Sequence, residues 1–208
     1  MSSTKSFAPE IFHRHAFVWF RVEDELLPAD DVLRTWLAQG HPLMVRSPCL
    51  STDGAKVCVG LSLPPNPQKR RLAFELPRAL VREVAPPPLC LPSTELLQQI
   101  QTAAEAELRT FGSHAWQRLT GLPYVTETSD IDLLIFLNSR QSWENTRHHL
   151  EQISWSSSPR IDLEIVLAGD ASFSWREFST SPQRLLFKGN SRVWLGNKHD
   201  VAKHLVGK

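Results

Sequence analysis

Two aspartates stand one residue apart, just before an apolar run, in the segment FGSHAWQRLTGLPYVTETSDIDLLIF (111–136). In a strand, residues two apart project to the same face, roughly 6–7 Å apart, so the carboxylates of Asp130 and Asp132 would repel each other. A divalent cation between them would remove that repulsion, because Mg²⁺ takes oxygen ligands, commonly one or two carboxylates together with substrate phosphates. The pair indicates a Mg²⁺ (or Mn²⁺) site, and the alternative is a solvated strand entrance.

A second acidic strand follows in RIDLEIVL (160–167). If this strand lies beside the first, Asp162 completes a carboxylate triad suited to metal-assisted transfer chemistry, as a third ligand or as the base for an attacking hydroxyl. Glu164 is either the outward neighbour of Asp162 or a structural partner of Arg160, and the sequence leaves both open.

Gly112 and Ser113 precede a short helical pattern that ends at Gly121. Glycine allows close approach of a phosphate to the backbone, and a helix start offers free N–H groups. A phosphate-binding turn is therefore one interpretation, and a serine N-cap after a flexible glycine is the other.

These residues need elements to position them, and the pattern predicts an α+β chain of two modules. The proline-rich segment APPPLCLPSTE (85–95) reads as a linker between an N-terminal α+β module, 1–88, and a catalytic module, 93–208. In the first module we expect strands at 16–20, 42–47 and 57–63 and a helix at 28–40. Arg78 and Arg82 have i, i+4 spacing that would place them on one helical face.

In the second module, the apolar spacing predicts a helix from 93 or 94 to about 109 and the short helix that ends at Gly121. A strand over 131–137, a helix over about 142–153 and a strand over 160–167 follow. RLLFKGNSRVWLG (184–196) reads as a hairpin around Gly189-Asn190.

Composition narrows the function classes. The chain has 208 residues and a formal net charge of +1, and it has no basic, aromatic-interleaved stripe, so nucleic-acid binding is not expected. No run approaches the roughly 18 apolar residues that a membrane span needs, and the N-terminus has no apolar signal segment. Three cysteines without a CxxC pair make a zinc site improbable and favour reduced thiols, so we expect a cytoplasmic protein.

The order helix, Gly-Ser, short helix, paired acids, helix, acidic strand resembles the nucleotidyltransferase superfamily of the DNA polymerase β type. Sixteen residues separate Ser113 from Asp130, which is longer than the commonest spacing there. The segment is similar to the phosphoribosyl-dephospho-CoA transferases of malonate decarboxylase operons, also called malonate decarboxylase holo-[acyl-carrier-protein] synthases. The residues that carry this resemblance are Gly112-Ser113, Trp116-Gln117, Thr120-Gly121-Leu122 and 129–134.

The resemblance implies a polymerase β-like domain with a mixed sheet. It implies transfer of a prosthetic group from 2'-(5-triphosphoribosyl)-3'-dephospho-CoA to a serine of the apo acyl carrier protein subunit of malonate decarboxylase, with release of diphosphate. Asp130, Asp132 and Asp162 would hold Mg²⁺ or Mn²⁺, and Gly112 and Ser113 would hold the triphosphate.

The resemblance implies less specific roles for the basic residues than for the aspartates. Lys188 would balance the charge of diphosphate, or it is a solvated lysine at a strand end. Lys69, Arg70 and Arg71 would meet a phosphate of the dephospho-CoA moiety or an acidic carrier protein, or they form a solvated loop. Two alternative functions stay open: another nucleotidyltransferase of this type that uses an ordinary nucleoside triphosphate, and a catalytically inactive nucleotide-binding module.

Overall fold

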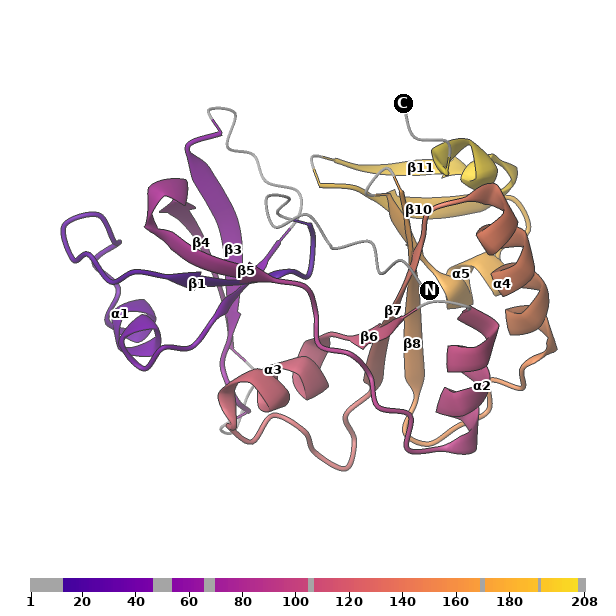
Figure 1. Cartoon of the computed structure of the whole chain (residues 1–208), viewed down its shortest axis with the longest axis horizontal. Coiled ribbons are helices and arrows are strands. Elements are labelled where there is room, and N and C mark those ends of the chain that lie inside the picture. The colour runs from indigo at the N-terminus through magenta and orange to yellow at the C-terminus, as the bar shows by residue number, and fades with distance from the viewer. Residues whose placement is uncertain are drawn as a thin grey trace, which may run out of the picture. The chain divides into compact units, whose positions relative to one another are not determined.

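A computed structural model describes residues 13–46, 54–65, 70–104, 107–168, 171–190 and 192–205. The chain divides into two compact units, residues 1–87 and 88–208 (Figure 1), which are described separately below. Both combine helices with sheets, so the predicted α+β class is confirmed. Within the described residues, no helix is both long enough and apolar enough to cross a membrane.

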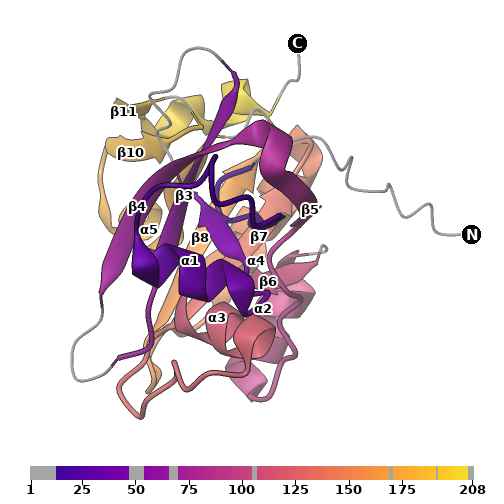
Figure 2. The same ribbon diagram turned by 90° about the vertical axis from the view of Figure 1, so that its left-hand side faces the viewer.

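The N-terminal unit is built on an antiparallel sheet with strand order β4-β3-β2-β1-β5. Helix α1, which lies beside these strands in Figure 2, begins after Asp30, whose carboxylate accepts a hydrogen bond from Leu33 N, and it buries Leu33, Trp36 and Leu37. The elements are β1 (Phe17–Phe20), α1 (Asp31–Ala38), β2 (Leu43–Val45), β3 (Lys56–Ser62), β4 (Arg71–Pro77), the 3-10 turn η1 (Arg78–Leu80) and β5 (Val81–Ala85).

Two expectations for this unit are corrected. Arg78 and Arg82 do not share a helical face, because Arg78 begins η1 and Arg82 lies in strand β5. Cys58 is disulfide-bonded, so the expectation of reduced thiols is wrong for this residue, whereas Cys90 is a free thiol.

The C-terminal unit is built on a mixed sheet with strand order β11-β10-β9-β8-β7-β6. Strands β7 and β8 are parallel, and the other neighbouring strands are antiparallel. The elements are α2 (Glu95–Ala104), β6 (Leu108–Thr110), α3 (Gly112–Thr120), β7 (Ile131–Leu137), α4 (Arg140–Gln152), β8 (Ile161–Leu167), β9 (Ser172–Ser174), α5 (Trp175–Thr180), β10 (Arg184–Lys188), β11 (Val193–Asn197) and the 3-10 segment η2 (Lys198–His204).

The core of this unit lies on one face of the sheet. Alternate residues of β7 and β8, such as Leu133 and Leu163, pack with apolar residues of α2 and α4, which flank the same side of the strands in Figure 1. The hydroxyl of the fully buried Thr146 in α4 donates to the carbonyl of Ala104 at the end of α2. Because successive strand residues alternate in direction, the remaining residues of β7 and β8 project from the opposite face.

The linker and the first helix differ from the sequence prediction. The predicted helix over 93–109 is wrong at its C-terminal end, because α2 ends at Ala104 and Leu108–Thr110 is a strand. The end of the proline segment pairs with that strand: Cys90 N donates to Leu108 O, and Thr110 N donates to Pro88 O. This part of the linker therefore belongs to the C-terminal unit.

Candidate active site

The paired and single aspartates lie at the start of two neighbouring parallel strands. Asp132 of β7 and Asp162 of β8 are directly opposite each other in the register, and Asp130 immediately precedes β7. Their strand neighbours Leu133 and Leu163 point into the core, so both aspartates project from the opposite face. Neighbouring strands are about 4.8 Å apart, so the parallel pairing brings the two carboxylates together.

Helix α3 begins against this acidic pair. The peptide before it is fixed by hydrogen bonds to β7, from Phe111 N and from the Thr110 hydroxyl to the carbonyl oxygen of Asp132. Gly112 has φ +61°, and a Cβ added to it would lie 2.8 Å from Asp132 Cγ and closer still to Oδ2. Glycine is therefore required here for two reasons, the left-handed conformation and the space that the carboxylate occupies.

Ser113 is the second residue of α3, one position after Gly112. The N-cap residue of this helix is Phe111, whose side chain has no hydrogen-bond acceptor, so the interpretation of Ser113 as a serine N-cap is wrong. The first N–H groups of a helix have no intrahelical partner and attract anions. The structure thus brings the predicted phosphate turn and Asp132 together.

Arg160 joins the other two aspartates. Its Nη2 atom lies 2.6 Å from Asp130 Oδ2 and 2.8 Å from Asp162 Oδ2, and Nε of Arg176 in α5 lies 3.7 Å from Asp162 Oδ1. The charges of Asp162 and Asp130 raise the pKa of the Arg160 guanidinium. Sequence reasoning paired Arg160 with Glu164 as one option and did not single out Arg176, because neither contact has a sequence signal.

Glu164 has a different environment from the aspartates. Its carboxylate is buried, with Oε1 2.6 Å from the Ser172 hydroxyl and Oε2 3.6 Å from Lys188 Nζ. Lys188 also approaches through its backbone, because its carbonyl oxygen lies 3.2 Å from the Ser172 hydroxyl. The predicted Lys188 therefore extends over the same sheet face as the aspartates, paired with a glutamate two residues beyond Asp162.

The segment between α3 and β7 is held by residues of the family-like motif. Gln117 Oε1 accepts hydrogen bonds from the N–H groups of Tyr124 and Val125, at 3.1 and 2.9 Å. Trp116 is buried and stacks on Tyr124. Gly121 ends α3 in the left-handed conformation, and the Ser129 hydroxyl accepts from Thr126 N. These motif residues shape the long connection that leads to Asp130.

The donor set suits Mg²⁺ or Mn²⁺, since it consists of carboxylate oxygens. In the described part of the chain, however, no three Asp, Glu, His or Cys side chains are grouped closely enough to hold an ion. The Arg160 guanidinium binds both Asp130 and Asp162 in this arrangement. The carboxylate ligands fit a divalent cation, while in this structure the Arg160 guanidinium contacts two of them.

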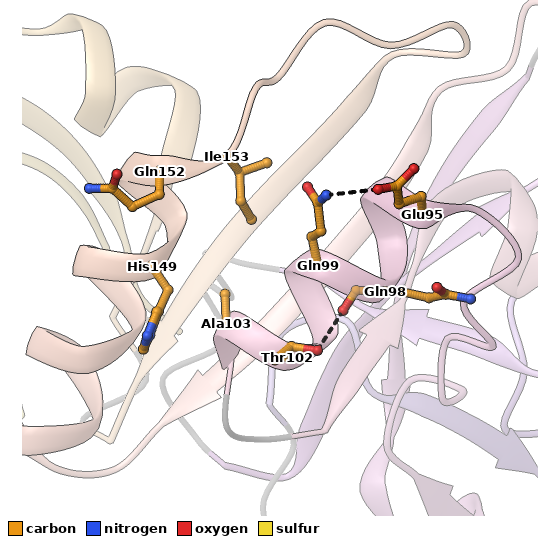
Figure 3. Close-up of a pocket in the computed structure, with 8 residues that line it drawn as sticks. All are labelled: Glu95, Gln98, Gln99, Thr102, Ala103, His149, Gln152 and Ile153. Carbon is orange, nitrogen blue, oxygen red and sulfur yellow. Dashed lines mark hydrogen bonds between the residues drawn. The ribbon is translucent and has the colours of Figure 1, made fainter.

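The other predicted basic residues belong to the N-terminal unit. Arg70 and Arg71 are exposed, just before and at the start of β4, and Lys69 lies outside the described residues. A surface groove of about 450 Å³ lies in the C-terminal unit between α2 and α4 (Figure 3). It contains none of the predicted site residues, and some of its polar groups bond within α2, as Gln99 does to Glu95.

Comparison with known proteins gives a consistent result. Residues 13–87 match the family model for the phosphoribosyl-dephospho-CoA transferase MdcG N-terminal domain, and residues 76–199 match that for the C-terminal domain. Relatives named phosphoribosyl-dephospho-CoA transferase include one from Bradyrhizobium diazoefficiens, 31% identical over 87% of this chain and 84% of its own length. Another, from Xanthomonas campestris pv. campestris, is 33% identical over 85% of this chain and 90% of its own.

No solved structure matches this chain. The family models span both units, and the relatives cover most of their own lengths. The family suggested by Gly112-Ser113, Trp116-Gln117 and 129–134 is thereby confirmed. The chain belongs to the MdcG phosphoribosyl-dephospho-CoA transferase family, a family of transferase enzymes.

Proposed function

We propose that this protein transfers the phosphoribosyl-dephospho-CoA group from 2'-(5-triphosphoribosyl)-3'-dephospho-CoA to a serine of the apo acyl carrier protein subunit of malonate decarboxylase. The observation that carries the proposal is the meeting of Gly112 with Asp132, and of Asp132 with Asp162, on one face of the sheet. Family membership supports the choice of donor, and the malonate decarboxylase acceptor rests on the family resemblance.

In the proposed reaction, the serine oxygen attacks the α-phosphorus of the triphosphate. An oxygen–phosphorus bond forms to the carrier protein, and the bond from the α-phosphorus to the bridging oxygen of diphosphate breaks. The serine proton passes to a base, the alternative role predicted for Asp162, and diphosphate leaves. Negative charge on the phosphoryl oxygens has to be stabilised in the transition state, so the residues around it must supply positive charge or N–H donors.

The chain's own residues have separate roles in this proposal. The first turn of α3, at Gly112 and Ser113, binds phosphate oxygens through its backbone N–H groups. Asp130, Asp132 and Asp162 hold a divalent cation, which would neutralise charge on the phosphoryl group when bound. Lys188, which lies beside Glu164 on the same face, is a candidate to balance the negative charge of diphosphate.

The donor and the acceptor can be tested together by intact-mass analysis. A cognate apo carrier protein is incubated with the enzyme, Mg²⁺ and either the triphosphoribosyl donor, ATP or CTP. We expect a mass gain equal to the phosphoribosyl-dephospho-CoA group with the triphosphoribosyl donor and no gain with ATP or CTP. Turnover with an ordinary nucleoside triphosphate only would overturn the proposal in favour of a different nucleotidyltransferase.

A further inference from the structure

One arginine nitrogen holds two of the proposed metal ligands. Nη2 of Arg160 lies 2.6 Å from a carboxylate oxygen of Asp130 and 2.8 Å from one of Asp162, while these aspartates are 32 residues apart in the chain. Two acidic groups thus share one positive charge. Without it, the carboxylates of the acid cluster (Asp130, Asp132 and Asp162) would repel each other more strongly, although Arg176 also lies 3.7 Å from Asp162.

The backbone of Arg160 is fixed, whereas its side chain is free to move away. Its carbonyl oxygen accepts a hydrogen bond from Ile131 N at 2.8 Å, which continues the β7–β8 pairing, but the side chain is 54% exposed. Exposed ion pairs contribute little to stability because water and salt screen them. Replacement of the guanidinium by another cation would leave the strand pairing intact.

A divalent ion and the guanidinium cannot both use the same carboxylate oxygens. In this structure both Asp130 and Asp162 are directed at Arg160, and the described residues contain no three-ligand group. We propose that Arg160 is the resident counter-ion of the acid cluster, which holds Asp130 and Asp162 in the metal-free protein and must be displaced before a divalent cation binds. This inference rests on the proposed metal-dependent function.

The counter-ion role predicts that metal affinity rises, rather than falls, when Arg160 is removed. A residue that orients metal ligands weakens metal binding when it is removed, whereas a competing counter-ion strengthens it. Removal of Arg160 should therefore tighten binding of the cation. Two exposed ion pairs lost together correspond to an affinity gain of about 2- to 30-fold.

Arg176 provides a matched control. It approaches Asp162 from α5 at 3.7 Å and is 55% exposed. Arg176→Gln removes the same unit charge near the site as Arg160→Gln, so it measures the general effect of charge. We expect it to change cation affinity by less than about twofold, since one long, exposed ion pair is weak.

The test is Mn²⁺ titration of the metal-free, full-length protein, followed by electron paramagnetic resonance of free Mn²⁺, without donor or carrier protein. Wild type, Arg160→Gln and Arg176→Gln are compared, each also with Asp132→Asn to locate the ion. We expect Arg160→Gln alone to bind Mn²⁺ more tightly than wild type. This binding should be lost when Asp132→Asn is added. The rise in unfolding temperature caused by Mn²⁺ should also be larger in Arg160→Gln than in wild type.

Different results would overturn the counter-ion role of Arg160 and the metal site itself. The counter-ion role would be overturned if wild type binds Mn²⁺ and Arg160→Gln binds it with equal or lower affinity. It would also be overturned if both arginine variants bind Mn²⁺ more tightly than wild type by the same factor. Either result would leave the metal site in place. Absence of binding in both wild type and Arg160→Gln, or binding insensitive to Asp132→Asn, would overturn the proposed metal site and the counter-ion role with it.

Discussion

The carboxylate of Asp132 fills the space where a side chain at Gly112 would begin. Gly112→Ala should therefore displace Asp132 and abolish transfer to the carrier protein. Gly121→Ala is the control, because Gly121 also has positive φ but nothing within 4 Å of an added Cβ. Both variants should lose about 1–2 kcal/mol of unfolding free energy from the left-handed conformation. Comparable transfer rates in the two variants would show that contact with Asp132 is unimportant.

Gln117 should stabilise the connection between α3 and β7 through two backbone hydrogen bonds. Gln117→Met removes the acceptor oxygen and should cost about 1–2 kcal/mol in urea unfolding. Gln117→Glu keeps an acceptor oxygen and should cost less. Gln99→Met, at an exposed position of α2, should change stability by less than about 0.5 kcal/mol. Equal losses in Gln117→Met and Gln117→Glu would contradict the acceptor role.

Lys188 and Glu164 should be energetically coupled, because the buried carboxylate lies 3.6 Å from the ammonium group. Lys188→Met leaves that charge less compensated and should cost about 1–3 kcal/mol of unfolding free energy. Glu164→Gln should relieve part of this cost in the double variant, and a double-mutant cycle measures the difference. Additive losses would argue against coupling.

The same cycle separates structure from catalysis. If Lys188 stabilises diphosphate, the double variant regains stability but not transfer activity. Recovery of both would mean that the lysine serves only to compensate Glu164.

Acid should destabilise the protein partly through His114. Burial lowers the pKa of this imidazole, and its Nε2 atom is buried without a hydrogen-bond partner among the described residues. Burial holds the folded pKa of His114 below the ordinary histidine value of 6.5. The stability of the fold with a neutral imidazole is therefore fully present above pH 6.5 and is lost as pH falls through the folded pKa. Unfolding free energy measured from pH 7 to 5 should thus decline less steeply in His114→Gln than in wild type. The exposed His148→Gln is the control, and parallel profiles for all three proteins would refute the assignment.

The strand that carries the paired aspartates was predictable from local pattern. Ile131–Leu137 matches the predicted boundaries, because a run of apolar residues after two acids can be buried only beyond Asp132. The strand at 161–167 and the hairpin around Gly189 also followed from apolar runs and turn residues, whereas the parallel pairing of 161–167 with β7 did not. Helix α4 starts two residues earlier than expected, since Ser139 and Ser142 form a capping box.

Long-range pairing accounts for most of what sequence reasoning missed. Leu108 continues the helical spacing of α2, yet Leu108–Thr110 pairs with β7, and tertiary pairing overrides the local pattern. Strand β9, Ser172–Ser174, is too short to give a periodic signal. The contacts of Arg160 with Asp130 and of Lys188 with Glu164 join residues that are far apart in the sequence, and spacing alone does not reveal them.

The proposed function assigns the transfer chemistry to the carboxylates at the start of β7 and β8. Its most direct test is the rate of mass gain of the apo carrier protein with Asp132→Asn, an isosteric change that should preserve folding. Wild type with Mg²⁺ should modify the carrier protein, while Asp132→Asn with Mg²⁺ and wild type with EDTA should be at least about a hundredfold slower. Near-wild-type modification by a folded Asp132→Asn variant would contradict the account.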